Sequence, residues 1–256
     1  MSNITLGADV EFFVYENDRP IPAIGLIGGD KRRPRDVTEG NLQEDNVMAE
    51  VAIKPAQTLE EWESRINSVY QELMQSVSPY TPLAIPSCQF PDEALTDPKA
   101  REFGCDPDLN AYTLEENQIS ASTLRNYRTC GGHIHVGGFE GDDMTLLRII
   151  FNLDLYLGVP SLFLDHDDFR RTLYGQAGTF RIKDYGLEYR TLSNFWAKDN
   201  RLIRWTYNQT IRAVQNALDG HEPDPTIAEV INNSDRGTAH ELVERYNLEV
   251  PYVNAP

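Results

Sequence analysis

The feature that most constrains this chain is an alternation of ionisable and apolar residues in four separate segments. Successive side chains of a β-strand point to opposite faces, so each segment predicts a strand with one polar and one apolar face. Exposure to water alone does not explain why the polar positions carry these residue types, which are ones that bind metal ions. The polar positions are Asp9 and Glu11, then Glu50, then His133 and His135, then Glu188 and Arg190.

Segments whose apolar residues follow the spacing of an α-helix lie between and after these predicted strands. Thr58 and Glu61 form a capping box in front of a helix that Ser78 and Pro79 end. Asp142 can cap an apolar helix over 144–157, and a helix over 203–218 is closed by Gly220, with a shorter helical region over 225–247. Because the strands are half polar and the helices amphipathic, we expect an α+β fold, a curved antiparallel sheet with helices packed on one face.

The rest of the chain is punctuated by turns. The first strand ends in a hairpin turn from Asn17 to Pro20, and two later strands are expected over 179–183 and 186–192. Residues 79–130 are expected to be mostly irregular, with one short strand over 83–85. A length of 256 residues favours one domain over 1–256.

Charge and composition restrict the partners. The net charge is −17, from 40 acidic and 23 basic residues, so duplex nucleic acid and anionic membranes would be repelled. Metal-bound nucleotides remain compatible with such a chain. Cys88, Cys105 and Cys130 show no CxxC spacing, and the N-terminus has no basic segment followed by an apolar run. We therefore expect a cytoplasmic protein without disulfides or a cysteine zinc site.

The polar strand faces predict a metal site if the strands are neighbours. Close carboxylates raise each other's pKa unless cations compensate. Mostly oxygen ligands with one imidazole suit Mg²⁺ or Mn²⁺, whereas zinc usually has more histidine or cysteine. The alternative is that Asp9 and Glu11 are simply solvated. The segment GGHIHVGG is more specific, because its glycines let a backbone or ligand approach two histidines of one face.

Basic residues gather in two places. Arg170, Arg171, Arg181 and Arg190 lie within one short stretch, where they can clamp phosphate or pair with the surplus carboxylates; Arg170 is expected to be exposed. The glycine-rich loop GLIGGDKRRPRD can contact an anion through Lys31 or Arg35, or be a solvated turn.

Five motifs together resemble the phage-encoded type-2 carboxylate–amine ligases, or amidoligases, a branch of the glutamine-synthetase-like superfamily. The motifs are GADVEF, QEDNVMAE, GGHIHVG, RRTLYGQAGTFR and YGLEYRTLSNFW, from about residue 6 to 197. The resemblance implies a curved antiparallel sheet that forms a tunnel-like site for ATP and two substrates. It does not extend to the separate N-terminal domain of glutamine synthetase, so that enzyme's ring assembly is not carried over.

Residue by residue, the resemblance implies a metal site and a phosphate site. Glu11, Glu50, His133 and Glu188 correspond to metal ligands, with Asp45 or Glu44 as supplements and Asp9 as the partner of Glu11. His135, Arg171, Arg190 and Lys31 would face the nucleotide. Arg181 and Arg190 would neutralise the transferred phosphate, so that Arg181, Arg190, Glu188 and Asp9 are the expected catalytic residues.

The function expected from this resemblance is an ATP- and Mg²⁺-dependent ligase that joins a carboxylate to an amine through an acyl phosphate. Its substrates would be small molecules or peptides, which the sequence does not specify further. Three alternatives stay open. They are a guanidino-kinase-like phosphotransferase on the same fold, an inactive phage interaction protein, and a metal hydrolase or oxygenase built on the two histidines.

Overall fold

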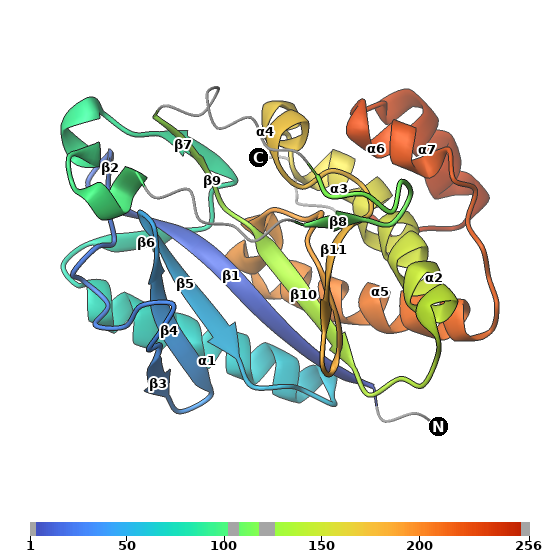
Figure 1. Cartoon of the computed structure of the whole chain (residues 1–256), viewed down its shortest axis with the longest axis horizontal. Coiled ribbons are helices and arrows are strands. Elements are labelled where there is room, and N and C mark those ends of the chain that lie inside the picture. The colour runs from blue at the N-terminus through green and yellow to red at the C-terminus, as the bar shows by residue number, and fades with distance from the viewer. Residues whose placement is uncertain (1–3, 102–107, 118–125, 252–256) are drawn as a thin grey trace.

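The computed structural model describes residues 4–101, 108–117 and 126–251, and Cys105 lies outside them. Most of its strands join one antiparallel sheet in the order β3-β4-β5-β1-β10-β12-β11-β8 (Figure 1). Two short strands, β2 and β6, pair with the far end of β1, and β7 pairs with β9 in a separate ribbon. The strands are β1 Thr5–Glu16, β2 Arg19–Ile21, β3 Arg35–Val37, β4 Gly40–Asp45, β5 Met48–Ile53, β6 Thr81–Leu83, β7 Ser87–Gln89, β8 Leu109–Asn110, β9 Tyr127–Thr129, β10 Gly132–Gly137, β11 Thr179–Lys183 and β12 Gly186–Tyr189.

The helices begin and end largely where the capping residues indicate. The Thr58 hydroxyl accepts a hydrogen bond from the Glu61 amide at 3.2 Å, and the Asp142 side chain caps α2 in the same way. The α-helices are α1 Leu59–Val77, α2 Asp143–Leu153, α3 Val159–Leu164, α4 Asp168–Leu173, α5 Asn200–Leu218, α6 Ile227–Asn232 and α7 Arg236–Arg245. A π-helical turn, Asp154–Gly158, joins α2 to α3, and short 3-10 turns cover Asp92–Leu95, Pro98–Arg101 and Asn194–Lys198.

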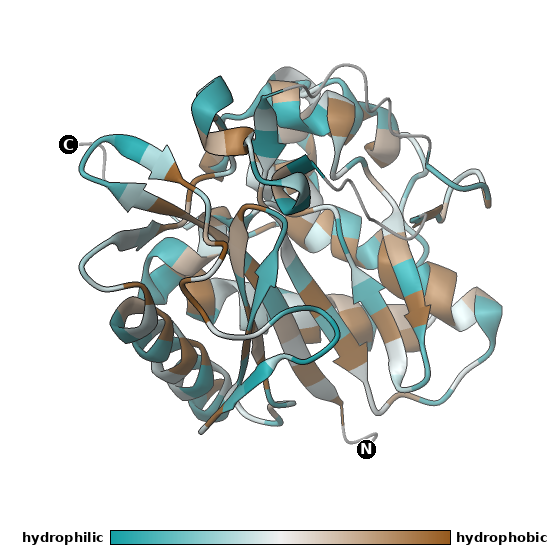
Figure 2. Ribbon diagram, turned by 60° about the vertical axis from the view of Figure 1, so that its left-hand side comes forward, coloured by the Kyte–Doolittle hydropathy of each residue, from teal (hydrophilic) through white to brown (hydrophobic). Residues whose placement is uncertain are grey.

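The core lies between the apolar face of the sheet and the helices α1, α2 and α5. Val10, Ile134 and Leu187 point to that face from neighbouring strands and are at most 1% exposed. Trp62 of α1 stacks on Trp196 with ring centroids 5.7 Å apart. Figure 2 shows the hydrophobic colouring concentrated along the central strands and the helices beside them. The expected α+β class, with an antiparallel sheet and packed helices, is confirmed.

The structure differs from the sequence prediction in the smaller strands. β4 was not expected as a separate strand, because only Gly40 and Leu42 among its residues are buried and its alternation is weak. The strand expected over 83–85 lies two residues earlier, at Thr81–Leu83. Both segments are short, and their pairing with longer strands outweighs their own weak propensity.

The continuous helical run Asp143–Leu164 is long and apolar enough, by length and composition, to cross a membrane. However, 72% of its most apolar window is buried inside the protein, where α2 packs on α5. Its apolar character is therefore accounted for by the core.

Candidate functional site

The antiparallel register brings the polar positions of five strands onto one face of the sheet. Glu11 lies opposite Glu50, and His135 lies opposite Glu188. Asp9 is the partner of His133 across β1 and β10. The sequence-predicted residues that meet on this face are Asp9, Glu11, Glu50, His133, His135, Arg181, Glu188 and Arg190.

The first acidic group consists of Glu11, Asp45 and Glu50, whose carboxylate oxygens lie within 4.8 Å of one another. Glu11 and Glu50 are each 7% exposed. The Gly131 amide donates to Glu11 Oε2 at 2.6 Å, and the Gln43 side-chain amide donates to Glu50 Oε2 at 2.6 Å. These bonds hold the two carboxylates side by side. Their mutual repulsion disfavours the charged forms unless a cation compensates.

The electrostatics of this first group favour binding of a cation. Burial, and next the charge of Asp45, raise the pKa of Glu11 to about 7. Burial and the charges of Asp9 and Asp45 raise the pKa of Glu50 well above its usual range. Lys31 Nζ lies 2.8 Å from Asp45 Oδ1 and supplies part of the missing positive charge. Lys31 was expected to face the nucleotide, and in the structure its ammonium contacts a carboxylate of this acidic group.

The second group consists of Asp9, His135 and Glu188, which also offer ligand atoms within 4.8 Å of one another. His135 Nε2 lies 3.1 Å from Asp9 Oδ2. His135 Nδ1 lies 2.9 Å from the Tyr185 hydroxyl, and the two rings are stacked with centroids 5.7 Å apart. Two carboxylates and one imidazole on rigid strands form a suitable ligand set for a hard cation.

His133 has a different environment from His135. It is 2% exposed, and its Nδ1 lies 3.1 Å from Arg190 and 3.5 Å from Glu188 Oε1. Its Nε2 is buried and has no hydrogen-bond partner among the described residues. Burial and the neighbouring Arg190 charge lower the pKa of His133 well below its usual range, so the ring is neutral. His133 belongs to none of the ligand groups found in the described part of the chain.

A basic cluster adjoins the second acidic group. Arg181 Nε lies 2.7 Å and Arg190 Nε 3.0 Å from the same oxygen of Asp108. Arg190 also contacts Glu188, and Lys183 Nζ lies 2.7 Å from Glu188 Oε2. Burial opposes ionisation of Glu188, yet the neighbouring His133, Arg190 and His135 side chains and the contact with Lys183 hold its pKa below the usual range. Glu188 is therefore a permanent anion between the acidic and basic parts of the face.

Several residues of the site were missed or only half expected. Asp45 and Glu44 were named as alternative supplements, and Asp45 is the one whose carboxylate lies with Glu11 and Glu50. Glu44 points to the other face of β4, where its Oε1 accepts a bond from the Gly25 amide at 2.8 Å. Lys183 could have been found, because it lies two residues from Arg181 on the same strand face. Asp108 carries no such signal, because β8 is only two residues long.

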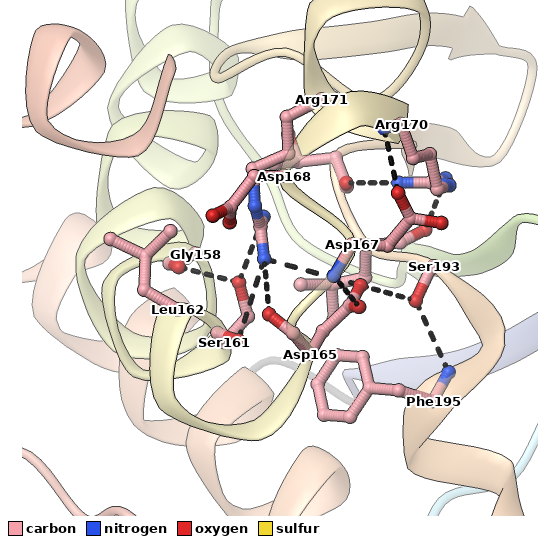
Figure 3. A network of polar contacts seen from close by, with 12 residues as sticks. Gly158, Ser161, Leu162, Asp165, Asp167, Asp168, Arg170, Arg171, Ser193 and Phe195 are labelled. Carbon is pink, nitrogen blue, oxygen red and sulfur yellow. Dashed lines mark hydrogen bonds and ion pairs between the residues drawn. The ribbon is translucent and has the colours of Figure 1, made fainter. Parts of the chain in front are cut away.

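Two of the four clustered arginines do not lie on the polar face (Figure 3). Arg170 was expected to be exposed but is 0% exposed. Arg171, expected beside the nucleotide, is 2% exposed, and its guanidinium contacts Ser161 and Asp165 within the helical layer. Both side chains fold back from the short helix α4 into the protein, where backbone carbonyls accept from both guanidiniums and Arg171 also faces the Asp165 carboxylate.

A family model described as phage phiEco32-like COOH.NH2 ligase-type 2 matches residues 117–214. The family resemblance is confirmed. The matched range contains strands β10, β11 and β12 of this chain. It therefore includes His133, His135, Glu188 and Arg190. The first acidic group comes from β1, β4 and β5, outside the matched range, and the sheet places it beside the matched strands. The match supports an enzyme of the carboxylate–amine ligase kind.

A solved structure described as a novel glutamine synthase homolog is similar with a TM-score of 0.43 and 11% identity. The similarity covers 95% of this chain and 63% of that one, so this chain spans less than two thirds of that protein's length. The comparison with curated proteins finds no match.

Proposed function

We propose that this chain is an ATP- and Mg²⁺-dependent carboxylate–amine ligase that works through an acyl phosphate, as one catalytic domain. The observation that carries the proposal is the meeting of two acidic groups and a basic cluster on one sheet face. Glu188 lies at their boundary, since it belongs to the second acidic group and contacts Arg190 and Lys183. A site that must hold cations and phosphate together needs this arrangement.

The residues fit a divalent ion. Glu11, Asp45 and Glu50 would hold one ion, and Asp9, His135 and Glu188 would hold another. The raised pKa of Glu11, to about 7, arises from burial and like charge, which a cation would relieve. Oxygen-rich ligand sets of this kind select Mg²⁺ or Mn²⁺. When bound, the ions would neutralise the phosphates of ATP and polarise the transferred group.

The chemical problem is that a carboxylate oxygen is a poor leaving group. In the proposed reaction a substrate carboxylate oxygen attacks the γ-phosphorus of ATP, and the bond to the ADP oxygen breaks. The amine nitrogen then attacks the acyl carbon, and phosphate leaves with the electron pair of the C–O bond. The amine also loses a proton, for which the site must supply an acceptor.

The protein's own residues have two tasks in this scheme. Arg190 and Arg181 are held by Asp108 at the edge of the acidic groups, where their charges would balance the transferred phosphate. Asp9, whose side chain is 22% exposed, is more open than Asp45 at 17% or Glu188 at 2%. Of the carboxylates in the two acidic groups, Asp9 is therefore the one that an incoming substrate reaches most readily.

The partners proposed are ATP and small-molecule or peptide substrates, in the cytoplasm. The test is a screen of paired carboxylates and amines with ATP and Mg²⁺, followed by mass spectrometry of the products. Formation of ADP together with an amide, and only when both substrates are present, is the expected result. ADP with a phosphorylated amine or guanidine would instead show a phosphotransferase, and no turnover with any pair would contradict the ligase. Carboxylate oxygen labelled with ¹⁸O must appear in the released phosphate if an acyl phosphate forms.

A further inference from the structure

We infer that Arg170 is a positioning residue, which holds the ends of β10 and β12 together behind the polar face. Arg190 and His133 are the side chains whose positions depend on it. The role in catalysis rests on the proposed function, whereas the role in positioning rests on the contacts alone.

The guanidinium of Arg170 bonds to backbone carbonyls just before β10 and just after β12. Its Nε donates to the carbonyl of Cys130 at 3.1 Å, three residues before His133. Its two terminal nitrogens donate to the carbonyls of Thr191 and Leu192, at 3.4 and 3.2 Å, directly after Arg190. One rigid fork thus spans two chain segments that are far apart in sequence.

A second path leads from Arg170 to Arg190 through Tyr174. The centres of both guanidiniums lie 5.6 Å from the centroid of the Tyr174 ring. The Tyr174 hydroxyl accepts a hydrogen bond from Arg190 Nη2. Arg170 therefore fixes Arg190 from its backbone side and, through Tyr174, at its tip.

The charge of Arg170 is buried among backbone dipoles. Among the residues that the structure describes, no carboxylate forms an ion pair with it, and three carbonyl dipoles satisfy its donors instead. Burying a cation in this way is costly. A neutral residue would fill the same space at a lower cost in free energy if packing were the only role of this side chain. Gly175 leaves space for the Arg170 guanidinium, because a Cβ at this position would lie 2.4 Å from Arg170 Nη1.

Arg171 provides a matched control (Figure 3). It follows Arg170 on α4, is equally buried, and bonds to Ser161 and the carbonyl of Asp165. Its guanidinium also lies 4.0 Å from the Asp165 carboxylate, and none of these contacts is made to the segments that flank β10 and β12. Replacement of either arginine by lysine keeps the charge and removes the fork, so the two variants should lose similar stability but differ at the site.

The test uses nuclear magnetic resonance of the arginine Nε–H groups, with the Arg190 signal assigned by its loss in R190K. In the wild-type protein Arg190 Nε is buried 3.0 Å from Asp108 Oδ1, so its proton should exchange slowly. In R170K its exchange should be faster by roughly tenfold or more, and in R171K by less than about twofold. G175A places a Cβ, at a positive φ, against both Arg170 and the Thr191 carbonyl that Arg170 binds, so it disturbs the same contact; it should also speed the exchange, which covers the case in which R170K does not fold. An unchanged Arg190 signal in R170K and G175A, or an equal change in R171K, would overturn the inference.

Steady-state kinetics give the second readout. Displacement of Arg190 by about 1 Å should lower kcat by about 100-fold in R170K, with a smaller change in KM for ATP. R171K, assayed well below its melting temperature, should keep kcat within about twofold. If the wild-type protein shows no ligase turnover, the proposed function fails while the resonance of Arg190 still decides the role of Arg170. Equal kcat in R170K and wild type would limit Arg170 to a structural role.

Discussion

Glu11 and Glu50 lie directly opposite each other on β1 and β5, and both are 7% exposed. Like charges placed opposite on neighbouring strands destabilise a sheet. Asp45 joins them from β4, so three carboxylates share one buried corner. The free protein can relieve this repulsion by taking up protons, and the functional state by taking up a cation.

Stability without metal should therefore fall as the pH rises. The pKa of Glu11 is raised from 4.5 to about 7 in the folded protein, so the folded state binds its proton more tightly than the unfolded state. This contribution is complete below the unfolded pKa and is lost as the pH rises through about 7. In EDTA, the melting temperature of the wild type relative to E11Q should decrease between pH 5 and pH 8. Mg²⁺ should reverse the decrease at pH 8 and have little effect at pH 5; parallel curves for the two proteins would contradict this prediction.

Asp45 should be a ligand and Glu44 should not. D45N should weaken Mn²⁺ binding by about tenfold or more, because it removes one of three carboxylates in the first group. E44Q is the matched control, since Glu44 points to the other face of β4 and binds the Gly25 amide. Electron paramagnetic resonance of free Mn²⁺ gives both affinities. Equal weakening by the two substitutions would show that net charge alone matters.

The two histidines should have different functions. The geometry favours His135 as the metal ligand, since it shares a ligand group with Asp9 and Glu188. His133 instead faces Arg190 at 3.1 Å. H135A should raise the Mg²⁺ concentration needed for half-maximal activity, whereas H133A should lower kcat at saturating metal. The reverse pattern would restore the ligand role that the family resemblance implies for His133.

Asp108 should stabilise the fold as well as the basic cluster. Its side chain is 2% exposed and pairs with both Arg181 and Arg190. D108N should cost about 3 kcal/mol in the free energy of unfolding, because Arg190 is then left with one buried partner fewer. D36N, on the exposed edge strand β3, should cost less than about 0.5 kcal/mol. Urea denaturation measures both, and a D108N protein as stable as D36N would remove Asp108 from the account.

The sequence predicts the polar face well where a strand is long enough to alternate. Asp9, Glu11, His133, His135 and Glu188 follow from period-two patterns, and the register then brings them together. No such pattern marks Asp108, which directly precedes the short strand β8. The burial of Arg170 could not be predicted for a different reason. Its partners are backbone carbonyls from two distant segments. Every residue type has a backbone carbonyl, so the sequence does not indicate these partners.

The central claim is that the acidic and basic groups of this face bind a metal-bound nucleotide. Titration calorimetry with ATP, first in EDTA and then in Mg²⁺, tests it most directly. The acidic face should repel free ATP, so we expect binding in Mg²⁺ and an affinity weaker by at least about tenfold in EDTA. The E50Q variant should lose most of the Mg²⁺-dependent gain. Equal affinity for ATP in EDTA and in Mg²⁺ would contradict the metal-bridged site.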